Sequence, residues 1–335
     1  MDLVTQGVLG AALSQASAKR PQIRLAGFCG FLAGMAADLD VLIRSSSDPL
    51  MFLEYHRHFT HALAFIPVGG FLSALVVYAL IRKRGGLTFA ETFLYCTLGY
   101  ATHALLDACT TYGTSLLWPF SAARVAWNVV AVVDPLVTVP LTVLILVSLF
   151  KRNPVYARAA LAWVVLYLGA GAWQHSRALD TAREIAAARG HAPTRVEAKP
   201  SFANILVWRT IYDTPDSFYV DAVRTGIVAK VFEGTFAPKL DTARDLPWLS
   251  PDSQQAKDIE RFRFFSDGFI ARDPAHDNRI IDIRYSFAPN DIRALWSIEL
   301  SPDAPPEAHA RYLTHRAQAR ESLALLWRMI WLRGA

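Results

Sequence analysis

Cysteine is scarce in this chain of 335 residues, and the part after residue 174 has none. The three cysteines, Cys29, Cys96 and Cys109, fall in or beside apolar runs, and no two of them have the spacing of a paired metal motif. We therefore expect all three to be small buried residues. The pattern gives no support to a cysteine-ligated metal site.

Several other signals are missing as well. The start MDLVTQG carries an acid and no basic residue, so we expect no cleavable signal peptide. The sequence has no internal repeat or low-complexity tract, and residues 175–335 show no spacing typical of a catalytic motif. A nucleic-acid binder is disfavoured, because the excess basic residues occupy short loops between apolar runs rather than a soluble face or an arm.

Long apolar runs dominate the first half of the chain. The 53% hydrophobic content and the mean hydropathy of +0.24 exceed what a soluble protein usually carries. We predict that residues 1–174 form a membrane all-α bundle of about five to six helical spans. The first run is short and polar enough to be either a tilted span or a re-entrant helix, and the second contains Gly27, Gly30 and Gly34, which suit close helix packing. The runs are residues 3–18, 25–43, 61–81, 87–107, 129–150 and 157–174.

Charge is spread unevenly along the chain. Residues 1–174 carry 12 basic and 8 acidic side chains, whereas the remainder carries 22 and 21. Nine of those 12 basic residues lie in the loops 19–24, 82–86 and 151–158, which contain no acid. The positive-inside rule therefore predicts that these three loops face the cytoplasm.

Strict alternation of the spans then places the loops 44–60 and 108–124 outside the cytoplasm, together with residues 175–335. Four histidines and four acids fall toward the outer ends of the apolar runs: Asp38, Asp40, His56, His58, His61, His103, Asp107 and Asp134. The charge argument used none of these residues, so their convergence on one side supports it independently.

The second domain, residues 175–335, is predicted to be a small soluble α+β domain packed at the membrane surface. The last span should continue as a helix to a C-cap at Gly190. Ser250 gives a cap signal for a helix to about Phe264, and a closing helix is predicted over residues 305–333. Alternating β-branched and aromatic residues predict strands at 194–200, 204–212, 217–223, 226–232, 280–287 and 294–300.

Two pairs of polar residues lie near the ends of apolar runs. His103 and Asp107 are four residues apart, so on a helix an imidazole and a carboxylate would point from the same wall. Asp38 and Asp40 are two apart, and they can serve one site only if the helix ends there, which the loop after them supports. Both pairs combine the residue types that bind metal ions.

A third cluster is the segment HRHFTH, which places His56, His58 and His61 at the start of an apolar run. Thr60 could be the N-cap of that helix. Each of the three clusters also has an ordinary explanation: a hydrogen-bonded histidine in a membrane helix, solvated interfacial acids, or solvated histidines. All three ordinary explanations would have to hold at once, on the same side of the membrane, which is less probable than any one of them alone.

Imidazole nitrogens and carboxylate oxygens together suit a divalent metal ion that activates water, with zinc first and manganese or iron as alternatives. Such a set allows either one metal with carboxylates behind its ligands or two metals that share an Asp. Arg57 or Arg124 could bind an anionic group such as phosphate, although Arg124 lies among aromatic residues and could equally be an interfacial anchor. The predicted ligands are His56, His61, His103 and Asp107, with Asp38 and Asp40 as ligands, outer partners or general base.

The motifs in order are A-D-L-D, H-R-x-x-T-H, G-Y-x-x-H-x-L-L-D-x-x-T-x-Y-G, L-W-P-F and V-D-P-L. Over residues 1–150 this pattern resembles the YdjM-like family of bacterial membrane-bound metal-dependent hydrolases. The resemblance implies a multi-span inner-membrane protein with a metal site. His58 stands where a small residue is expected, and Ala37 where a Pro often stands; His58 is either an extra ligand or only a neighbour. The matched positions are Asp38, Asp40, His56, Thr60, His61, His103, Asp107, Thr110, Gly113 and Asp134.

We predict a metal-dependent hydrolase that acts at the outer face on a lipid-linked or amphiphilic substrate, with a phosphoester as the leading candidate. Its partners would be membrane lipid and this substrate, and not nucleic acid. The predicted catalytic residues are Asp38, Asp40, Arg57 and His58.

Two other functions stay open. One is a non-catalytic envelope protein, in which a metal staples the helices and the soluble domain binds a partner; a closed coordination shell would favour it. The other is a transporter with an outer cation site near Asp134. The transporter ranks last, because residues 66–80 and 136–150 contain no acid, base or histidine.

Overall fold

The computed structural model describes residues 1–316 and 319–332, and it divides into two compact units. The first unit comprises Met1–Ile43, Tyr55–Trp173 and Phe202–Asn204. The second comprises Arg44–Glu54, Gln174–Ser201 and the chain from Ile205 onward.

Helices make up the first unit. The long ones are α1 (Leu3–Ser17), α2 (Ile23–Ala36), α4 (Ile66–Ile81), α5 (Phe89–Ala108), α6 (Pro135–Lys151) and the first part of α7 (Pro154–Ala188). The short 3₁₀ helices are η1 (Arg20–Gln22), η2 (Ala37–Leu42), η3 (Phe59–His61), η4 (Leu63–Phe65) and η5 (Arg82–Arg84). Among the described residues, three helical stretches are long and apolar enough to cross a membrane, at Arg20–Leu42, Leu63–Ile81 and Pro154–Ala188. The helical membrane region is thereby confirmed, and a total of five to six spans stays a prediction.

The start of α6 is set by its own residues. Asp134 accepts a hydrogen bond from the N–H of Leu136, and Pro135 occupies the first helical position. The helix predicted over residues 129–150 therefore begins only at Pro135. The Asp134 carboxylate, which the sequence placed inside a span, instead caps the N-terminus of this apolar helix.

Glycines bring α1, α2 and α5 together backbone to backbone. A Cβ atom added to Gly10 of α1 would lie 2.3 Å from the carbonyl oxygen of Gly30 in α2, and one added to Gly99 of α5 would lie 2.5 Å from the same oxygen. On Gly27 or Gly34, an added Cβ would lie 2.5 or 2.7 Å from atoms of α1. The predicted close packing at the glycines of α2 is confirmed, and it holds these three helices at a fixed separation.

Gly30→Ala is expected to destabilise the protein by about 1–3 kcal/mol, because the added methyl group would overlap the backbone of α1. Gly169→Ala in α7 is the matched control, since a Cβ there meets nothing within 4 Å. The control should be neutral or stabilising by up to about 1 kcal/mol, because alanine favours helices over glycine. Thermal unfolding of both purified variants, followed by circular dichroism, measures the difference. Equal midpoints would contradict the close α1–α2 contact.

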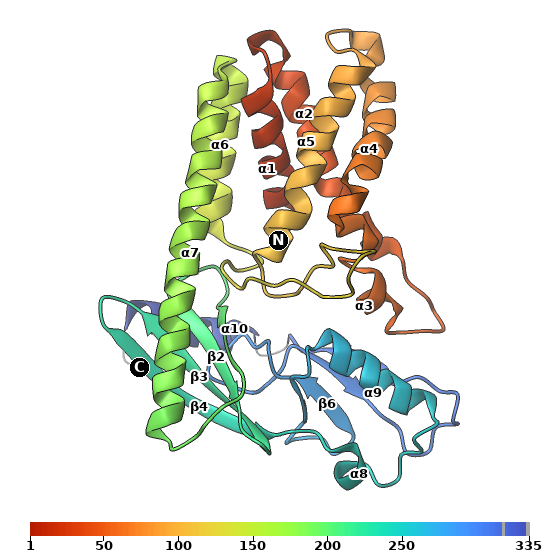
Figure 1. The fold of residues 1–335 in the computed structure, drawn as a ribbon, viewed down its shortest axis with the longest axis vertical. Coiled ribbons are helices and arrows are strands. Elements are labelled where there is room, and N and C mark those ends of the chain that lie inside the picture. The colour runs from red at the N-terminus through yellow and green to blue at the C-terminus, as the bar shows by residue number, and fades with distance from the viewer. Residues whose placement is uncertain (317–318, 333–335) are drawn as a thin grey trace. The chain divides into compact units, whose positions relative to one another are not determined.

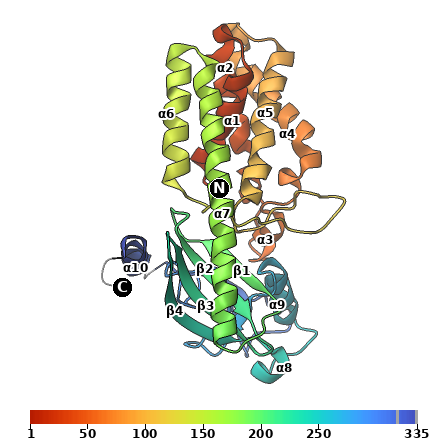
Figure 2. The same ribbon diagram turned by 60° about the vertical axis from the view of Figure 1, so that its left-hand side comes forward.

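The basic loops and the His/Asp residues lie at opposite ends of the first unit. The α1–α2, α4–α5 and α6–α7 connections, which carry the basic residues, gather at one end (Figure 1, Figure 2). The η2 segment, the C-terminal end of α5 and the N-terminus lie at the other (Figure 1). The three basic loops therefore lie at one end of the first unit, as the loop charges predicted. That this end faces the cytoplasm stays a prediction.

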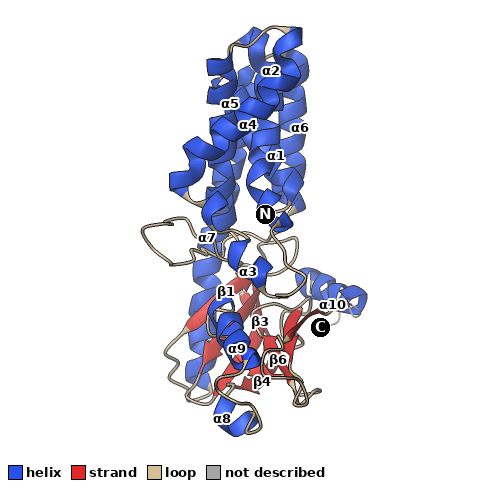
Figure 3. Ribbon diagram, turned by 90° about the vertical axis from the view of Figure 1, so that its right-hand side faces the viewer, coloured by secondary structure: helices blue, strands red, loops and turns tan. Residues whose placement is uncertain are grey.

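All strands that the structure describes belong to the second unit (Figure 3). One antiparallel sheet runs in chain order through β1 (Val196–Pro200), β2 (Val207–Asp213), β3 (Ser217–Thr225) and β4 (Ala229–Pro238). The other runs through β5 (Ile270–Arg272), β6 (Arg279–Asp282), β7 (Trp296–Glu299) and β8 (Arg311–Thr314). The helices are α3 (Met51–Tyr55, up to Glu54), the end of α7, α8 (Thr242–Asp245), α9 (Gln254–Phe265) and α10 (Ala319–Trp331). The predicted mixture of sheets and helices after the apolar half is confirmed, as is the end of α7 near Gly190, whose φ is 74°.

A short segment from the apolar half belongs to the second unit, which the sequence did not predict. Leu50 and Leu53 are buried in the same apolar cluster as Ile259 of α9. Arg261, also on α9, binds Asp48 at 2.8 Å and Glu54 at 2.8 Å. The chain between η2 and the histidine cluster is therefore fixed by the second unit rather than by the bundle.

Three local predictions for the second domain were wrong in detail. Ser253 rather than Ser250 caps α9, because the Ser253 hydroxyl accepts the N–H of Ala256. The strand predicted at 280–287 ends with β6 at Asp282. The range 305–333 contains β8 followed by α10, and residues 317, 318 and 333 lie outside the described residues. Residues 311–314 form a strand rather than the predicted helix because they pair with β7.

Candidate metal centre

Three segments of the first unit bring their polar side chains to one place. The 3₁₀ helix η2 carries Asp38 and Asp40, η3 ends with His61, and the last turns of α5 carry His103 and Asp107. The side chains of the two histidines and of Asp107 are fully buried, whereas that of Asp38 is 19% exposed. The i, i+4 spacing on α5 places His103 and Asp107 on one wall, as predicted.

Four of these side chains each direct one atom toward a common point. His61 Nε2 lies 3.3 Å from Asp107 Oδ2 and 3.5 Å from Asp38 Oδ1. His103 Nε2 lies 3.6 Å and 3.4 Å from the same two oxygens. A tetrahedron with metal–ligand bonds of about 2.0–2.2 Å has edges of roughly 3.3–3.6 Å, because the edge is about 1.63 bond lengths. Four of the six distances between these atoms therefore match the edges of a tetrahedral coordination shell, and all four atoms lie within 4.8 Å of one another.

Three of the four atoms are buried and make no hydrogen bond: His61 Nε2, His103 Nε2 and Asp107 Oδ2. Asp107 Oδ2 has one cation beside it, the guanidinium of Arg57 with Nε at 3.0 Å. A buried polar atom that makes no hydrogen bond costs about 1–3 kcal/mol, and more where the group is charged. A divalent cation held between these atoms would satisfy all three at once. On the residues present, the cluster fits a metal ion.

The other nitrogen of each imidazole is held by the protein, which leaves Nε2 for a metal. His103 Nδ1 lies 2.6 Å from the carbonyl oxygen of Gly34, to which it donates. His61 Nδ1 lies 3.2 Å from Asp40 Oδ2 and 3.0 Å from Thr60 Oγ1. Metal-binding histidines are normally oriented in this way by a carbonyl or carboxylate behind them.

Asp40 is such a carboxylate. Its Oδ2 accepts the backbone N–H of Arg57 at 2.9 Å and the hydroxyl of Thr60 at 2.9 Å, and its Oδ1 lies 2.9 Å from Nδ1 of His56. Thr60 thus binds Asp40 and does not cap a helix, contrary to the prediction. Asp40, Asp38 and His56 form a second group with ligand atoms within 4.8 Å of one another. The hydrogen bonds already made by Asp40 favour a positioning role for it.

Arg57 supports the opposite side of the centre. Its Nε lies 3.0 Å from Asp107 Oδ2, and its Nη1 donates to Thr110 Oγ1 at 2.8 Å. The residue is buried and adopts a left-handed backbone with φ 61°, a conformation that costs a non-glycine residue of order 1–3 kcal/mol and that clusters at functional sites. The guanidinium also lies over the ring of Tyr112.

Sequence reasoning missed two contacts to Asp107. Its Oδ1 accepts the side-chain amide of Gln6 at 2.8 Å and the amino group of Met1. Gln6 lies in the first turns of α1, and Met1 directly precedes the Asp2 cap of that helix. A glutamine inside an apolar helix was the available signal, but only the packing of α1 against α5 reveals its partner.

Three other residues that the sequence analysis named lie outside both His/Asp groups. The ring of His58 contacts the rings of Trp118 and Phe59. Arg124 donates to the carbonyl of Gly113 at 2.9 Å. Asp134, besides capping α6, accepts the hydroxyl of Tyr167 at 2.8 Å.

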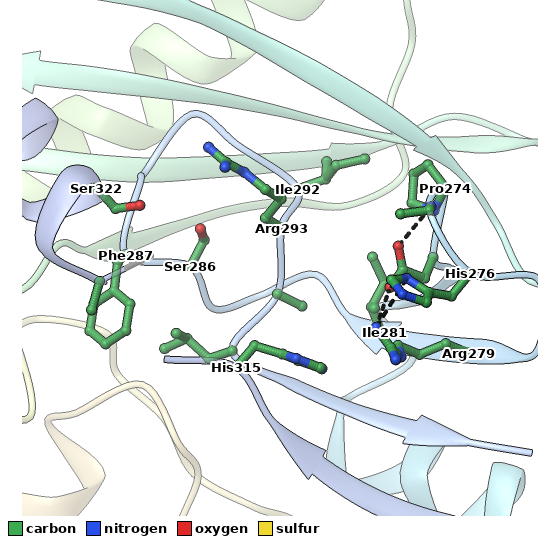
Figure 4. Close-up of a pocket in the computed structure, with 15 residues that line it drawn as sticks. Pro274, His276, Arg279, Ile281, Ser286, Phe287, Ile292, Arg293, His315 and Ser322 are labelled. Atoms are coloured by element: carbon green, nitrogen blue, oxygen red, sulfur yellow. Dashed lines mark hydrogen bonds and ion pairs between the residues drawn. The ribbon is translucent and has the colours of Figure 1, made fainter. Parts of the chain in front are cut away.

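The second unit contains a cavity of about 400 Å³, lined by residues of β6, of the loops on either side of it and of the start of α10 (Figure 4). Ile281 and Phe287 line it together with Arg279 and His315 (Figure 4). Arg279 binds Glu299 at 2.9 Å, and burial, with the charge of Arg279, lowers the pKa of His315 below its usual value. Both groups of His and acidic residues that could hold a metal, among the described residues, lie in the first unit.

Residues 1–178 match the family model described as YdjM inner membrane protein. The chain is 28% identical over 144 residues to the uncharacterized protein YfhP of Bacillus subtilis, a match that covers 41% of this chain and 43% of that protein. It is 33% identical over 111 residues to the inner membrane protein YbcI of Escherichia coli, covering 31% of this chain and 61% of that protein. The matches thus span less than two thirds of either relative. No solved structure matches the chain significantly.

Proposed function

Because this chain belongs to the YdjM inner membrane protein family and its buried His/Asp cluster could hold a metal, we propose that it is a metal-dependent hydrolase of the inner membrane. The observation that carries the proposal is the convergence of three buried ligand atoms that make no hydrogen bond, with Asp38 Oδ1 3.5 Å and 3.4 Å from the two imidazole nitrogens. His61, His103 and Asp107 would hold a divalent ion. Zinc suits this set best, and manganese or iron is the alternative.

A divalent ion in this place would act as a Lewis acid and lower the pKa of a water molecule toward neutrality. Catalytic zinc sites typically use three protein ligands and leave a fourth position open, and two histidines with one carboxylate is a known set. Here the three buried side chains supply those ligands. Asp38 is the one partly exposed member, so it lies on the side from which water and substrate can approach.

Asp38 is therefore the proposed general base. Its carboxylate lies beside both imidazoles and could accept a proton from the attacking water. Asp40 and Arg57 position the ligands, Asp40 by holding His61 and Arg57 by pairing with Asp107. His58 is left without a role at the centre in this proposal.

The surroundings of the site support an amphiphilic substrate. Leu117, Phe120 and Trp127, from the loop that follows α5, are 50%, 87% and 48% exposed. Exposed apolar and aromatic side chains suit the level of lipid headgroups. We therefore propose a lipid-linked or amphiphilic ester as substrate, with a phosphoester first, and place the site on the outer face from the charge of the basic loops.

Asp38→Asn tests this mechanism. We expect the variant to retain close to one metal ion per chain, because the three buried ligands remain, and to lose at least about 100-fold in turnover, because the general base is gone. Metal content is measured by mass spectrometry, and turnover by release of phosphate or fatty acid from phospholipids and lipid phosphates, with a chelator control. Asp180→Asn, an exposed acid on α7, serves as the control.

A structural metal site is the second candidate, and one observation favours it. Four protein side chains, whose ligand atoms all lie within 4.8 Å of one another, could close the coordination shell and leave no position for water, as structural zinc sites do. The protein would then be a non-catalytic envelope protein whose soluble domain binds a partner. Under this alternative Asp38→Asn sheds the metal and the wild-type protein hydrolyses none of the lipids, so metal retention by the variant would rule it out.

A further inference from the structure

The helix α10 leaves one apolar face uncovered. Leu326 and Met329 are buried against the first sheet, in a cluster with Phe232 of β4. Trp327 and Trp331, on the same helix, are 61% and 57% exposed. Two large exposed tryptophans on one short helix are unusual for a water-facing surface, and tryptophan is enriched where proteins meet the membrane interface.

The turn between β3 and β4 is exposed and apolar as well. Ile227 and Val228 at its tip are 102% and 80% exposed. The backbone at the end of β3 is tied to α10, because Arg224 Nε donates to the carbonyl of Ile330 at 2.9 Å. The hairpin tip and the end of α10 therefore belong to one surface of the second unit, beside the first sheet (Figure 2).

The same hairpin is fixed to α7 where the apolar part of that helix ends. Arg177 Nη2 donates to the carbonyl oxygens of Gly226 at 2.5 Å and of Ile227 at 3.3 Å, and Gln174 Nε2 donates to that of Thr225 at 3.0 Å. Gln174 directly follows the apolar stretch of the candidate span in α7. At 1.5 Å rise per residue, Arg177 lies only about 6 Å further along the helix axis than Trp173. The tip is thus bound to the first residues of α7 that follow its apolar stretch.

We propose that the β3–β4 tip and the exposed face of α10 form a lipid-contact surface, defined by Ile227, Val228, Trp327 and Trp331, which inserts into the bilayer interface. Apolar tip residues would enter the headgroup region, and the tryptophans would lie at its level. Lys230 and Arg328, next to these residues in the chain, would contact anionic headgroups. A second copy of the chain or a protein partner would not require the tip to be bound to the residues that directly follow an apolar helix.

Spin labels at single introduced cysteines test the proposal on the full chain in nanodiscs of equimolar phosphatidylcholine and phosphatidylglycerol. The labelled variants are Ile227→Cys and Trp327→Cys. Phe264→Cys on α9 is the matched control, because Phe264 is 56% exposed and α9 packs in the cluster of the second sheet, whereas α10 packs on the first. The wild-type chain, whose three cysteines are buried, measures background labelling.

Labels at 227 and 327 should collide more with oxygen, which concentrates in lipid, than with a water-soluble nickel chelate. The control at 264 should show the reverse. Nickel accessibility at 227 and 327 equal to that at 264 would overturn the proposal, because the surface would then face water. Shielding of both labels from oxygen and nickel alike would overturn it too, because a protein contact would cover the surface instead.

Discussion

Replacing His103 by alanine is expected to abolish metal binding, with an affinity loss of at least about 100-fold, while the helices remain folded. The side chain supplies one of the converging buried atoms, and no other described histidine lies where it could take over that position. Loss of partners behind a ligand already costs about 10–100-fold in metal affinity, so loss of the ligand itself should cost more. Metal content after purification and zinc titration of the stripped protein measure the effect.

His58→Ala is the matched control for this variant. Both are histidines in the membrane half, but His58 belongs to neither His/Asp group and contacts aromatic rings instead. The control should retain its metal. Circular dichroism and size-exclusion profiles matching the wild type would show that His103→Ala has lost metal rather than fold. Full metal content in His103→Ala, or equal loss in both variants, would contradict the assigned ligand set.

Asp40→Asn is expected to weaken metal binding by about 10–100-fold without abolishing it. The carboxylate holds His61 from behind and accepts hydrogen bonds from Arg57 and Thr60. An amide of the same shape has only one acceptor oxygen, and its NH₂ group would face donors, so the imidazole would lose its fixed orientation. Excess zinc should restore full occupancy to Asp40→Asn, but not to His103→Ala.

The same titration separates a positioning role from a ligand role for Asp40. A ligand would fail like His103, with no recovery in excess zinc. An unimportant residue would bind like the wild type, as Asp180→Asn should. Only a shifted, saturable binding curve agrees with the hydrogen bonds that the structure shows around Asp40.

Much of the site was predictable from the sequence because its signals are local. The i, i+4 spacing of His103 and Asp107 fixes their common direction on any helix. The end of a helix at Asp38 and Asp40 was expected, and η2 provides it. The sequence did not indicate that the two acids lie near opposite nitrogens of His61. Asp38 lies near Nε2, which faces the candidate metal centre, and Asp40 lies near Nδ1, where it positions the ring.

Other features escaped prediction because they depend on partners far along the chain. Asp134 looked like a possible cation ligand, but its capping of α6 and the hydroxyl of Tyr167 use its oxygens. The loop at residues 44–54 looked like part of the membrane half, yet Arg261 and the apolar core around α9 hold it in the second unit. Pairing with β7 likewise made a strand of residues 311–314.

The sequence by itself determined the apolar helices, the small residues at which they pack, the grouping of basic loops and the residue types of the site, since these follow from composition and from periodicity over a few residues. The tertiary structure decided which nitrogen of each imidazole faces the centre, which carboxylate stands behind a ligand and where each loop packs. Those outcomes depend on side-chain directions and on contacts between residues tens to hundreds of positions apart. No local sequence pattern predicts these outcomes, because the free energy of each arrangement depends on segments that come into contact only in the folded protein.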